Sequence, residues 1–148
     1  EEVEVDPWVK NYDTSDDDPG RWGSRFDTSN WGLLGAYEDG SRIGGAVIAY
    51  DTPNVHMLRG RRDLAVLWDL RVAQGVRRRG IGGALFEAAK DWAGERGCRA
   101  LEIETQQINV PACRFYEQMG CSLARIDLFA YPELPDETQL IWHLDLTS

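Results

Sequence analysis

Hydrophobic residues recur at two spacings along the chain, and each spacing predicts a different kind of element. Short runs that are alternately or continuously apolar are typical of strands. They predict strands over residues 33–37, 43–50, 64–72, 100–105, 122–129 and 139–146. Apolar residues spaced three and four apart are typical of one helix face. This spacing predicts two helices. The apolar face of the first contains Ile81, Leu85, Ala88, Ala89 and Trp92, and that of the second contains Ala112, Phe115, Tyr116 and Met119.

Turn-forming residues separate these runs and indicate where elements begin and end. Asp39-Gly40 predicts a tight hairpin, because both central residues of such a turn adopt positive φ angles. Gly97 and Gly120 each follow a helical run and are expected to end it. Asn109 is a good helix cap, and the proline two residues later is tolerated in a first turn.

The strand over 64–72, the helix after it and the strand over 100–105 form a βαβ unit. A connection of that length brings the second strand back parallel to the first. The other strands are expected to pair antiparallel. The pattern therefore predicts a single α/β domain over residues 1–148, with a mixed, mostly antiparallel sheet flanked by helices.

The composition is that of an acidic globular protein. The chain has 148 residues, 43% of them hydrophobic, and a formal net charge of −9. That charge argues against a broad nucleic-acid surface, so we expect no nucleic-acid partner. Net acidity most often serves solubility, and the alternative is a site that attracts a cationic substrate.

The cysteines and the absence of long apolar runs bear on location. Cys98, Cys113 and Cys121 form no Cys-x-x-Cys pair and are odd in number. They indicate free thiols in a reducing compartment, so we expect a cytoplasmic protein. No apolar run approaches the roughly 20 residues of a membrane span, and no signal peptide is visible, so no membrane partner is expected.

The segment that joins the strand over 64–72 to the next helix has the chemistry of a phosphate site. Three consecutive arginines, 77–79, precede Gly80, Gly82 and Gly83. Glycines allow close backbone approach, and the free N–H groups and dipole of a helix start favour an anion. Arginines add charge-assisted donors for phosphate oxygens. The alternative is a glycine-rich turn with solvated arginines.

Arg77, Gly80 and Gly82 match Arg/Gln-x-x-Gly-x-Gly/Ala, and the segment resembles motif A of the GNAT acetyltransferase superfamily. The resemblance implies a GNAT-type sheet whose two central parallel strands splay apart, with the pantetheine of acetyl-CoA in the split. It implies backbone contacts to pantetheine from Leu70, Arg71 and Val72. The residues implied to hold the pyrophosphate are Arg77, Arg78, Arg79, Gly80, Ile81, Gly82, Gly83 and Ala84.

Asn109, Ala112 and Tyr116 match Asn-x-x-Ala-x-x-x-Tyr, which resembles motif B of the same superfamily. The resemblance implies that these residues also contact the coenzyme, and that Tyr116 is the general acid for the leaving thiolate. A thiolate leaves more readily if a phenol can give it a proton. The alternative is that Tyr116 is one more aromatic residue on the buried face of its helix.

Three carboxylates fall on the central strands, where side chains are normally apolar. Glu102 and Glu104 alternate with apolar residues on one strand, and Asp69 lies in the neighbouring strand. Carboxylates are costly there unless they line a water-filled cleft. Either glutamate could take a proton from an amine, directly or through water, or bind a cationic group. The alternative, for Asp69 as well, is a salt bridge to a nearby arginine.

Other catalytic arrangements are absent from the sequence. His56 and His143 have no metal-ligand neighbours at useful spacing, and no Gly-x-Ser-x-Gly elbow exists. We therefore expect no metal site and no serine nucleophile.

A longer combination resembles the streptothricin acetyltransferases of that superfamily. It comprises Leu101-Glu102-Ile103-Glu104-Thr105-Gln106, then Asn109-Val110-Pro111-Ala112-Cys113-Arg114-Phe115-Tyr116, then Tyr131 and Pro132 near a strand that contains Ile141-Trp142. Pro7-Trp8-Val9-Lys10-Asn11-Tyr12 also resembles a segment near the start of these proteins. The chain departs from this group in two ways. Trp68 precedes Asp69 where members often carry glutamate. The chain also begins late, so we expect the opening strand and helix of the superfamily to be absent or shortened.

These resemblances imply an acetyl-CoA-dependent N-acetyltransferase that acts on a primary amine of a small cationic acceptor. A streptothricin-type antibiotic is the candidate acceptor, which would make the activity one of antibiotic resistance. The alternatives are a protein or peptide amine acetyltransferase and a non-catalytic acyl-CoA-binding module. The general base remains open between Glu104, Glu102, Asp69 and a water relay, and the assembly between a monomer and a homodimer.

Overall fold

The computed structural model describes residues 26–75 and 80–147. Two of the sequence predictions concern residues outside these ranges. One is the absent or shortened opening of the chain, and the other is the set of arginines Arg77, Arg78 and Arg79.

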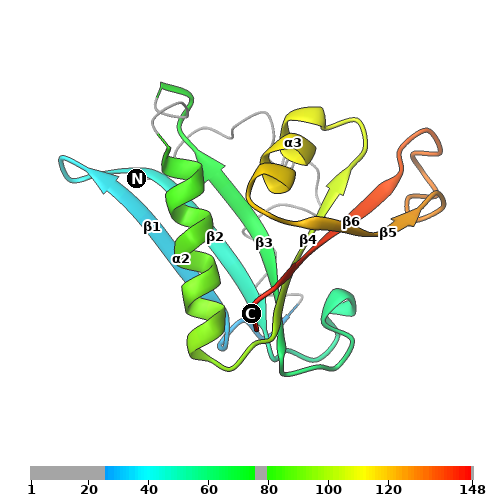
Figure 1. Cartoon of the computed structure of the whole chain (residues 1–148), viewed down its shortest axis with the longest axis horizontal. Coiled ribbons are helices and arrows are strands. Elements are labelled where there is room, and N and C mark those ends of the chain that lie inside the picture. Colours follow the sequence, from blue (N-terminus) through cyan, green and yellow to red (C-terminus); the bar gives the residue numbers. More distant parts are fainter. Residues whose placement is uncertain (1–25, 76–79, 148) are drawn as a thin grey trace.

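A six-stranded sheet in the order β1-β2-β3-β4-β6-β5 forms the body of the described part (Figure 1). Its strands are β1 (Gly32–Glu38), β2 (Ser41–Tyr50), β3 (Leu64–Val72), β4 (Ala100–Gln106), β5 (Ser122–Asp127) and β6 (Gln139–Asp145). β3 and β4 pair parallel, and the other neighbours pair antiparallel. The predicted mixed, mostly antiparallel sheet is confirmed.

Turn chemistry accounts for the strand ends at the β1–β2 hairpin and at the end of β5. Asp39 and Gly40 have φ angles of 52° and 82°, as the predicted hairpin between β1 and β2 requires. The strand predicted over 122–129 stops earlier, at Asp127. Asp127 Oδ1 accepts a hydrogen bond from the backbone N–H of Phe129 at 2.8 Å, which starts a turn.

Two helices pack on the same face of the sheet and share one core (Figure 1). α2 (Ile81–Glu95) covers β1, β2 and β3. α3 (Val110–Gln118) is capped by Asn109, and Gly120 follows it with a φ of 98°. Gly97 likewise follows α2, with a φ of 82°. A short 3-10 turn, η2 (His56–Leu58), lies in the segment expected to be a loop.

The buried face of α2 differs from the predicted one. Leu85 and Ala89 are buried as expected, but Ala88 is exposed, so its prediction was wrong. Phe86 is fully buried instead, and its ring lies 6.2 Å from that of Phe115 on α3. Contact with a second helix rotates the buried stripe toward α3, which the spacing within one helix cannot reveal.

A second, smaller core covers the opposite face of the sheet. Its buried members include Leu58 of η2 and Leu64 and Val66 of β3. Trp68 packs against this cluster, and its ring lies 5.3 Å from that of Trp31 and 5.6 Å from that of Phe26. β3 is therefore covered on both faces, as expected for a strand in the middle of a sheet.

The sheet is split between its two parallel strands. β3 and β4 pair only at Leu64–Ala100, Ala65–Leu101 and Val66–Glu102. Beyond these pairs β3 continues along β2, and β4 continues along β6, so the two strands diverge. At the point of divergence β3 has a bulge, because Leu67 pairs with Ile48 and Asp69 pairs with Val47. Trp68 is the extra residue.

Candidate active site

A small hollow lies where β3 and β4 diverge. Its volume is about 30 Å³, which is enough for one water-sized group such as an ammonium head. Its lining residues are Met57, Val66, Leu67, Trp68 and Glu104. The hollow therefore has an apolar and aromatic wall from β3 and η2 and one carboxylate from β4.

The N-terminus of α2 has the features of an anion site. Gly80 precedes the helix with a φ of 79°, which a residue with a side chain rarely adopts. Among the residues that the structure describes, no side chain caps this end, and the first turn contains no acidic residue. The first backbone bond of the helix runs from Ala84 N–H to the Gly80 carbonyl at 3.0 Å. The N–H groups of Ile81, Gly82 and Gly83 precede that bond and suit a pyrophosphate.

The edge of β3 that faces the split suits pantetheine. From Leu67 to Val72 this edge has no partner strand among the described residues. An extended chain with amide groups can pair with such an edge as an added strand would. The backbone of Leu70, Arg71 and Val72 lies in this stretch, and their contact with the coenzyme stays a prediction.

Tyr116 is buried on α3, toward the core that α2 and α3 share. Its ring lies 6.0 Å from that of Phe86 and 5.1 Å from that of Phe115, and the residue is 4% exposed. Burial, and then the negative charge of Asp69, raise the pKa of the Tyr116 hydroxyl above its ordinary value. The hydroxyl is therefore protonated at neutral pH, which a proton donor requires.

The other two motif B residues have evident structural roles. Asn109 Oδ1 accepts a hydrogen bond from the backbone N–H of Ala112 at 3.3 Å and so caps α3. Ala112 is fully buried, which lets α3 approach the sheet closely. Both roles position Tyr116 one helical turn later, and direct contact of either residue with the coenzyme stays a prediction.

Two of the three candidate carboxylates carry cationic partners. Asp69 Oδ2 accepts a hydrogen bond from Arg71 Nε at 2.8 Å, and both side chains are largely buried. Glu102 has a 3% exposed side chain and accepts hydrogen bonds from Arg59 at 3.2 Å and from His143 at 2.9 Å. Arg125 approaches it to 3.5 Å.

The pKa of Glu102 reflects these partners. Burial raises the pKa of this carboxyl, but the hydrogen bonds from His143 and Arg59, together with the charges of Arg59 and Arg125, outweigh burial and leave the pKa below its ordinary value. Glu102 is thus a charged carboxylate whose charge is already matched.

Glu104 has different surroundings. Its Oε2 accepts a hydrogen bond from the hydroxyl of Tyr131, a neutral donor. None of the lysines, arginines and histidines that the structure describes forms an ion pair with it. Since Glu104 also lines the hollow, it is the candidate carboxylate best placed to meet a cationic group.

Sequence reasoning missed several partners of these carboxylates. Arg59, Arg125 and Tyr131 come from three separate loops and strands, and no local spacing links them to β4. A signal did exist for Tyr131, because it belongs to the combination that resembles streptothricin acetyltransferases. The resemblance did not, however, indicate what Tyr131 does.

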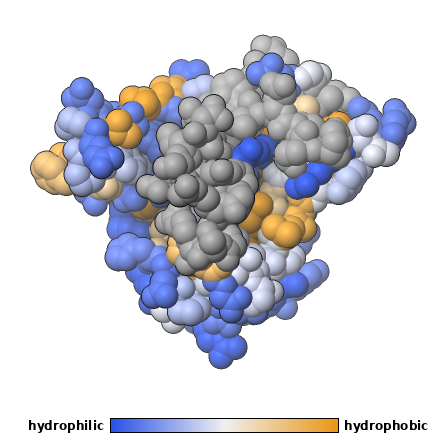
Figure 2. Space-filling view, turned by 180° about the vertical axis from the view of Figure 1, so that it is seen from behind, coloured by the Kyte–Doolittle hydropathy of each residue, from blue (hydrophilic) through white to orange (hydrophobic). Residues whose placement is uncertain are grey.

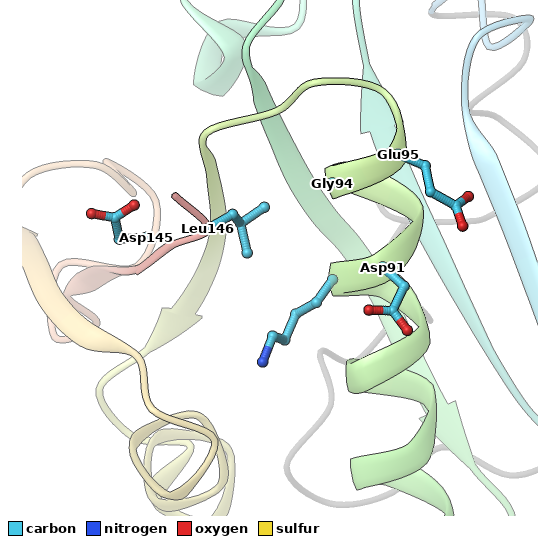
Figure 3. Close-up of a pocket in the computed structure, with 6 residues that line it drawn as sticks. Asp91, Gly94, Glu95, Asp145 and Leu146 are labelled. Carbon is cyan, nitrogen blue, oxygen red and sulfur yellow. The ribbon is translucent and has the colours of Figure 1, made fainter. Parts of the chain in front are cut away.

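A larger hollow lies elsewhere, between one side of α2 and the end of β6 (Figure 3). Its volume is about 480 Å³, and its lining residues are Lys90, Asp91, Gly94, Glu95, Asp145 and Leu146. It contains none of the residues around the split. Its lining has no aromatic residue and none of the residues that match motifs A and B, so we do not place the chemistry there.

Comparison with known proteins identifies the family. The chain matches the profile described as Acetyltransferase (GNAT) family over residues 1–121. The chain belongs to the GNAT acetyltransferase family. The resemblance of motifs A and B to that family is thereby confirmed, and the parts that the split sheet, the start of α2 and Tyr116 play in its site stay predictions.

Curated relatives of this GNAT chain include streptothricin acetyltransferases. The chain is 34% identical to the Escherichia coli protein over 145 residues, which are 94% of this chain and 71% of that protein. It is 32% identical to the Streptomyces lavendulae protein over 117 residues, which are 79% of this chain and 57% of that protein. The chain therefore spans little more than half the length of the second relative.

Solved structures show the same fold. A Bacillus anthracis str. Ames protein in complex with acetyl coenzyme A superposes with a TM-score of 0.65 at 31% identity, over 75% of this chain and 60% of that chain. Nourseothricin acetyltransferase superposes with a TM-score of 0.63 at 29% identity, over 74% and 61% respectively.

Family membership makes this GNAT chain an N-acetyltransferase with acetyl-CoA as its co-substrate. The residues that the structure describes include no helix long and apolar enough to cross a membrane. Within residues 26–75 and 80–147, no group of three or more His, Cys, Asp and Glu could hold a metal ion. Cys98, Cys113 and Cys121 are free thiols, as predicted.

Proposed function

We propose that this GNAT enzyme acetylates a primary amine of a small cationic acceptor, and that streptothricin-type antibiotics are such acceptors. The observation that carries the proposal is the position of Glu104. It lines the hollow at the split, and its described hydrogen-bond partner is neutral. A carboxylate whose charge is unmatched favours a cation beside it.

The hollow suits the head of such an acceptor. One wall is the indole of Trp68, and Met57 and Leu67 add apolar surface. An aromatic face next to a carboxylate is a favourable environment for an ammonium group. A carbon chain that carries the ammonium can pack on the apolar wall. Trp68 therefore supplies a different kind of acceptor contact from the acid that streptothricin acetyltransferases often carry there.

Each residue of the site has one part in the proposed reaction. Glu104 accepts a proton from the acceptor ammonium, directly or through water, because only the free amine attacks. The amine nitrogen then bonds to the thioester carbonyl carbon and the carbon–sulfur bond breaks. Tyr116 donates its hydroxyl proton to the sulfur that leaves. The excess proton on the new amide returns through water to Tyr116, and Glu104 releases its proton to solvent, so both groups are restored. The N–H groups at the start of α2 hold the pyrophosphate in place.

The similarity to streptothricin acetyltransferases supports the choice of acceptor. Streptothricins carry primary amino groups, so they belong to the class that the hollow favours. The net charge of −9 would also attract a polycation toward the protein.

The test is an acceptor screen with acetyl-CoA, read both as thiol release and as mass spectrometry of the acceptor. The panel contains a streptothricin, linear polyamines and a peptide with a free amino terminus. We expect a mono-acetylated streptothricin, with Glu104→Gln lowering turnover while acetyl-CoA still stabilises the fold. Acetylation of the peptide alone would reassign the enzyme to protein or peptide amines. Binding of acetyl-CoA without turnover of any amine would indicate a non-catalytic acyl-CoA-binding module.

A further inference from the structure

Tyr131 reaches the candidate active site from outside the two GNAT motifs. It lies in the turn-rich segment between β5 and β6, and its hydroxyl donates to Glu104 Oε2. Gln106, two residues further along β4, donates to the same hydroxyl oxygen from Nε2 at 3.5 Å. Tyr131 thus receives one hydrogen bond and gives one, and the one it gives ends on the carboxylate that lines the hollow.

The protonation state of Tyr131 suits a donor. Burial raises the pKa of its hydroxyl above the ordinary value, and the neighbouring charge of Glu104 raises it further. At neutral pH the hydroxyl therefore keeps its proton and donates it in a hydrogen bond. The bond also holds the carboxylate in one orientation, because a single donor fixes Oε2.

The segment that carries Tyr131 is itself anchored to the end of β4. Gln107 Nε2 donates to the Asp136 carbonyl at 2.8 Å, and Gln107 Oε1 accepts from the Thr138 N–H at 2.5 Å. Within the segment, Leu134 N–H donates to the Tyr131 carbonyl at 2.9 Å. Side chain and backbone bonds therefore fix the segment against the same strand that carries Glu104.

A neutral hydrogen-bond partner leaves the negative charge of Glu104 available to a ligand, whereas a cationic partner does not. An arginine on Glu104 would orient the carboxylate and also neutralise it, as Arg59 does for Glu102. A phenol orients one oxygen and leaves the negative charge for another group. None of the residues described here donates to Oε1 of Glu104, so that oxygen is available to an incoming ammonium.

We propose that Tyr131 is a positioning residue for acceptor turnover, which holds Glu104 Oε2 so that Oε1 faces the hollow between β3 and β4. This inference rests on the proposed function in one respect, namely that Glu104 meets the acceptor amine. Tyr131 itself touches neither reactant. It acts through Glu104, and Gln107 acts one step further back by holding the segment.

The experiment is a double-mutant cycle on turnover. Tyr131→Phe keeps the ring and removes the donor. We expect it to lower kcat/KM for the amine about tenfold and to leave KM for acetyl-CoA unchanged within about twofold, since misplacement of a reacting group costs rate. In a Glu104→Gln background, Tyr131→Phe should lower kcat/KM for the amine by less than about twofold, because the effects of residues that act as a unit are not additive. Tyr50→Phe, which removes a hydroxyl bonded to Arg96 at 3.4 Å, is the matched control.

Gln107→Met provides a second route to the same result. It removes both side-chain hydrogen bonds to the segment at nearly constant side-chain volume. We expect kcat/KM for the amine to fall, but by less than in Tyr131→Phe. Thermal melts of all variants show whether they fold. Equal losses from Tyr131→Phe in both backgrounds, or a parallel rise in KM for acetyl-CoA, would overturn the inference. So would wild-type turnover in Tyr131→Phe.

Failure of the proposed function gives a different result. If the wild-type enzyme acetylates only a peptide amine, the proposed acceptor is wrong, and the cycle is then measured with that peptide. Coupling between Tyr131 and Glu104 with the peptide supports the positioning role for the new acceptor. Independent losses overturn it.

Discussion

The ring of Tyr116 and its hydroxyl have separate surroundings. The ring packs with Phe86 and Phe115 in the core between α2 and α3. None of the described residues forms a hydrogen bond with the hydroxyl. The two interpretations of the sequence, a core aromatic and a general acid, are therefore compatible. The ring fixes the position of the hydroxyl, and the hydroxyl remains available to a ligand.

Substitution of Tyr116 by phenylalanine separates these two parts. Tyr116→Phe keeps the packing and removes the proton, so we expect turnover to fall by roughly 10²-fold or more. Stabilisation of the fold by acetyl-CoA should hardly change. Steady-state kinetics and thermal melts with acetyl-CoA measure the two quantities. Undiminished turnover in the variant would show that Tyr116 serves only the core.

At the scale of elements, α2 contributes both to the predicted pyrophosphate site and to the packing of the sheet. Its N-terminus faces the predicted pyrophosphate position, and its length lies against β1, β2 and β3. A change at its first turn should alter binding, and a change in its contact with β1 should alter stability.

Gly83 offers a test of the anion site that does not rely on loss of folding. A Cβ atom there would meet only Met119, at an ordinary distance of 4.0 Å. Acetyl-CoA should stabilise the wild type by about 2.7 kcal/mol at one hundred times its dissociation constant. Gly83→Asp should abolish the stabilisation by acetyl-CoA, because a carboxylate repels the pyrophosphate. The same carboxylate stabilises the helix itself, since negative charge is favourable near a helix N-terminus.

Gly83→Asn is the matched control, since it has the same shape without the charge. It should retain most of the stabilisation by acetyl-CoA. If both variants, or neither, lose the effect in thermal melts, charge at this helix start does not control coenzyme binding.

The contact of α2 with β1 depends on Gly32. A Cβ atom at this position would lie 2.5 Å from Cε2 of Trp92, whose ring also packs against Tyr50. Gly32→Ala should therefore lower the free energy of unfolding by about 1–3 kcal/mol, as overpacking does. Gly94→Ala on the same helix meets nothing within 4 Å and should raise it by about 0.5–1 kcal/mol. Denaturant unfolding compares the two, and similar changes of one sign would contradict this packing account.

For the whole molecule, Glu102 links parts of the chain that are far apart in sequence. Its carboxylate holds Arg59 after η2, Arg125 of β5 and His143 of β6. Because its folded-state pKa is below the ordinary value of 4.5, its contribution to stability is present above about that pH. The contribution is lost as the pH falls through the lower folded-state pKa.

Glu102→Gln should therefore lower the free energy of unfolding by about 2 kcal/mol at neutral pH, the usual worth of hydrogen bonds to a charged group. The difference from wild type should shrink as the pH falls below the ordinary value of 4.5 and through the lower folded-state pKa, because the wild-type carboxyl then becomes protonated. Urea unfolding at several pH values measures it, with exposed Glu133→Gln as the control. A difference that stays constant with pH would mean that the charge of Glu102 does not matter.

Much of the fold was predictable, because β3, α2, β4 and α3 have strong periodicity and clear end signals. Apolar alternation and turn residues specify these elements locally. The bulge at Trp68 was not predictable in this way, because it exists only in the pairing with β2. The spacing of residues along the sequence could not show that Glu102 forms ion pairs while Glu104 accepts a hydrogen bond from a neutral hydroxyl, because the partners of both come from distant segments.

The outer surface shows a further limit of local reasoning. β5 is exposed along its whole length, and the loops beside it expose Ile108, Leu128, Phe129 and Leu134. Figure 2 shows hydrophobic groups at that edge, seen from behind. The sequence left the assembly open between a monomer and a homodimer, and this edge is where mutations that alter assembly are best sought.

The brevity of the pairing between β3 and β4, only three residue pairs, has a consequence for hydrogen exchange. Every second N–H group from Leu67 to Val72 points toward the split, where the described chain offers it no acceptor strand. In heavy water these amides should take up deuterium quickly, although they belong to a strand that is buried on both faces. Acetyl-CoA should slow their uptake, while the amides shared by β4 and β6 keep their rates. We therefore expect β3, although it lies in the middle of the sheet, to exchange like an edge strand until acetyl-CoA binds.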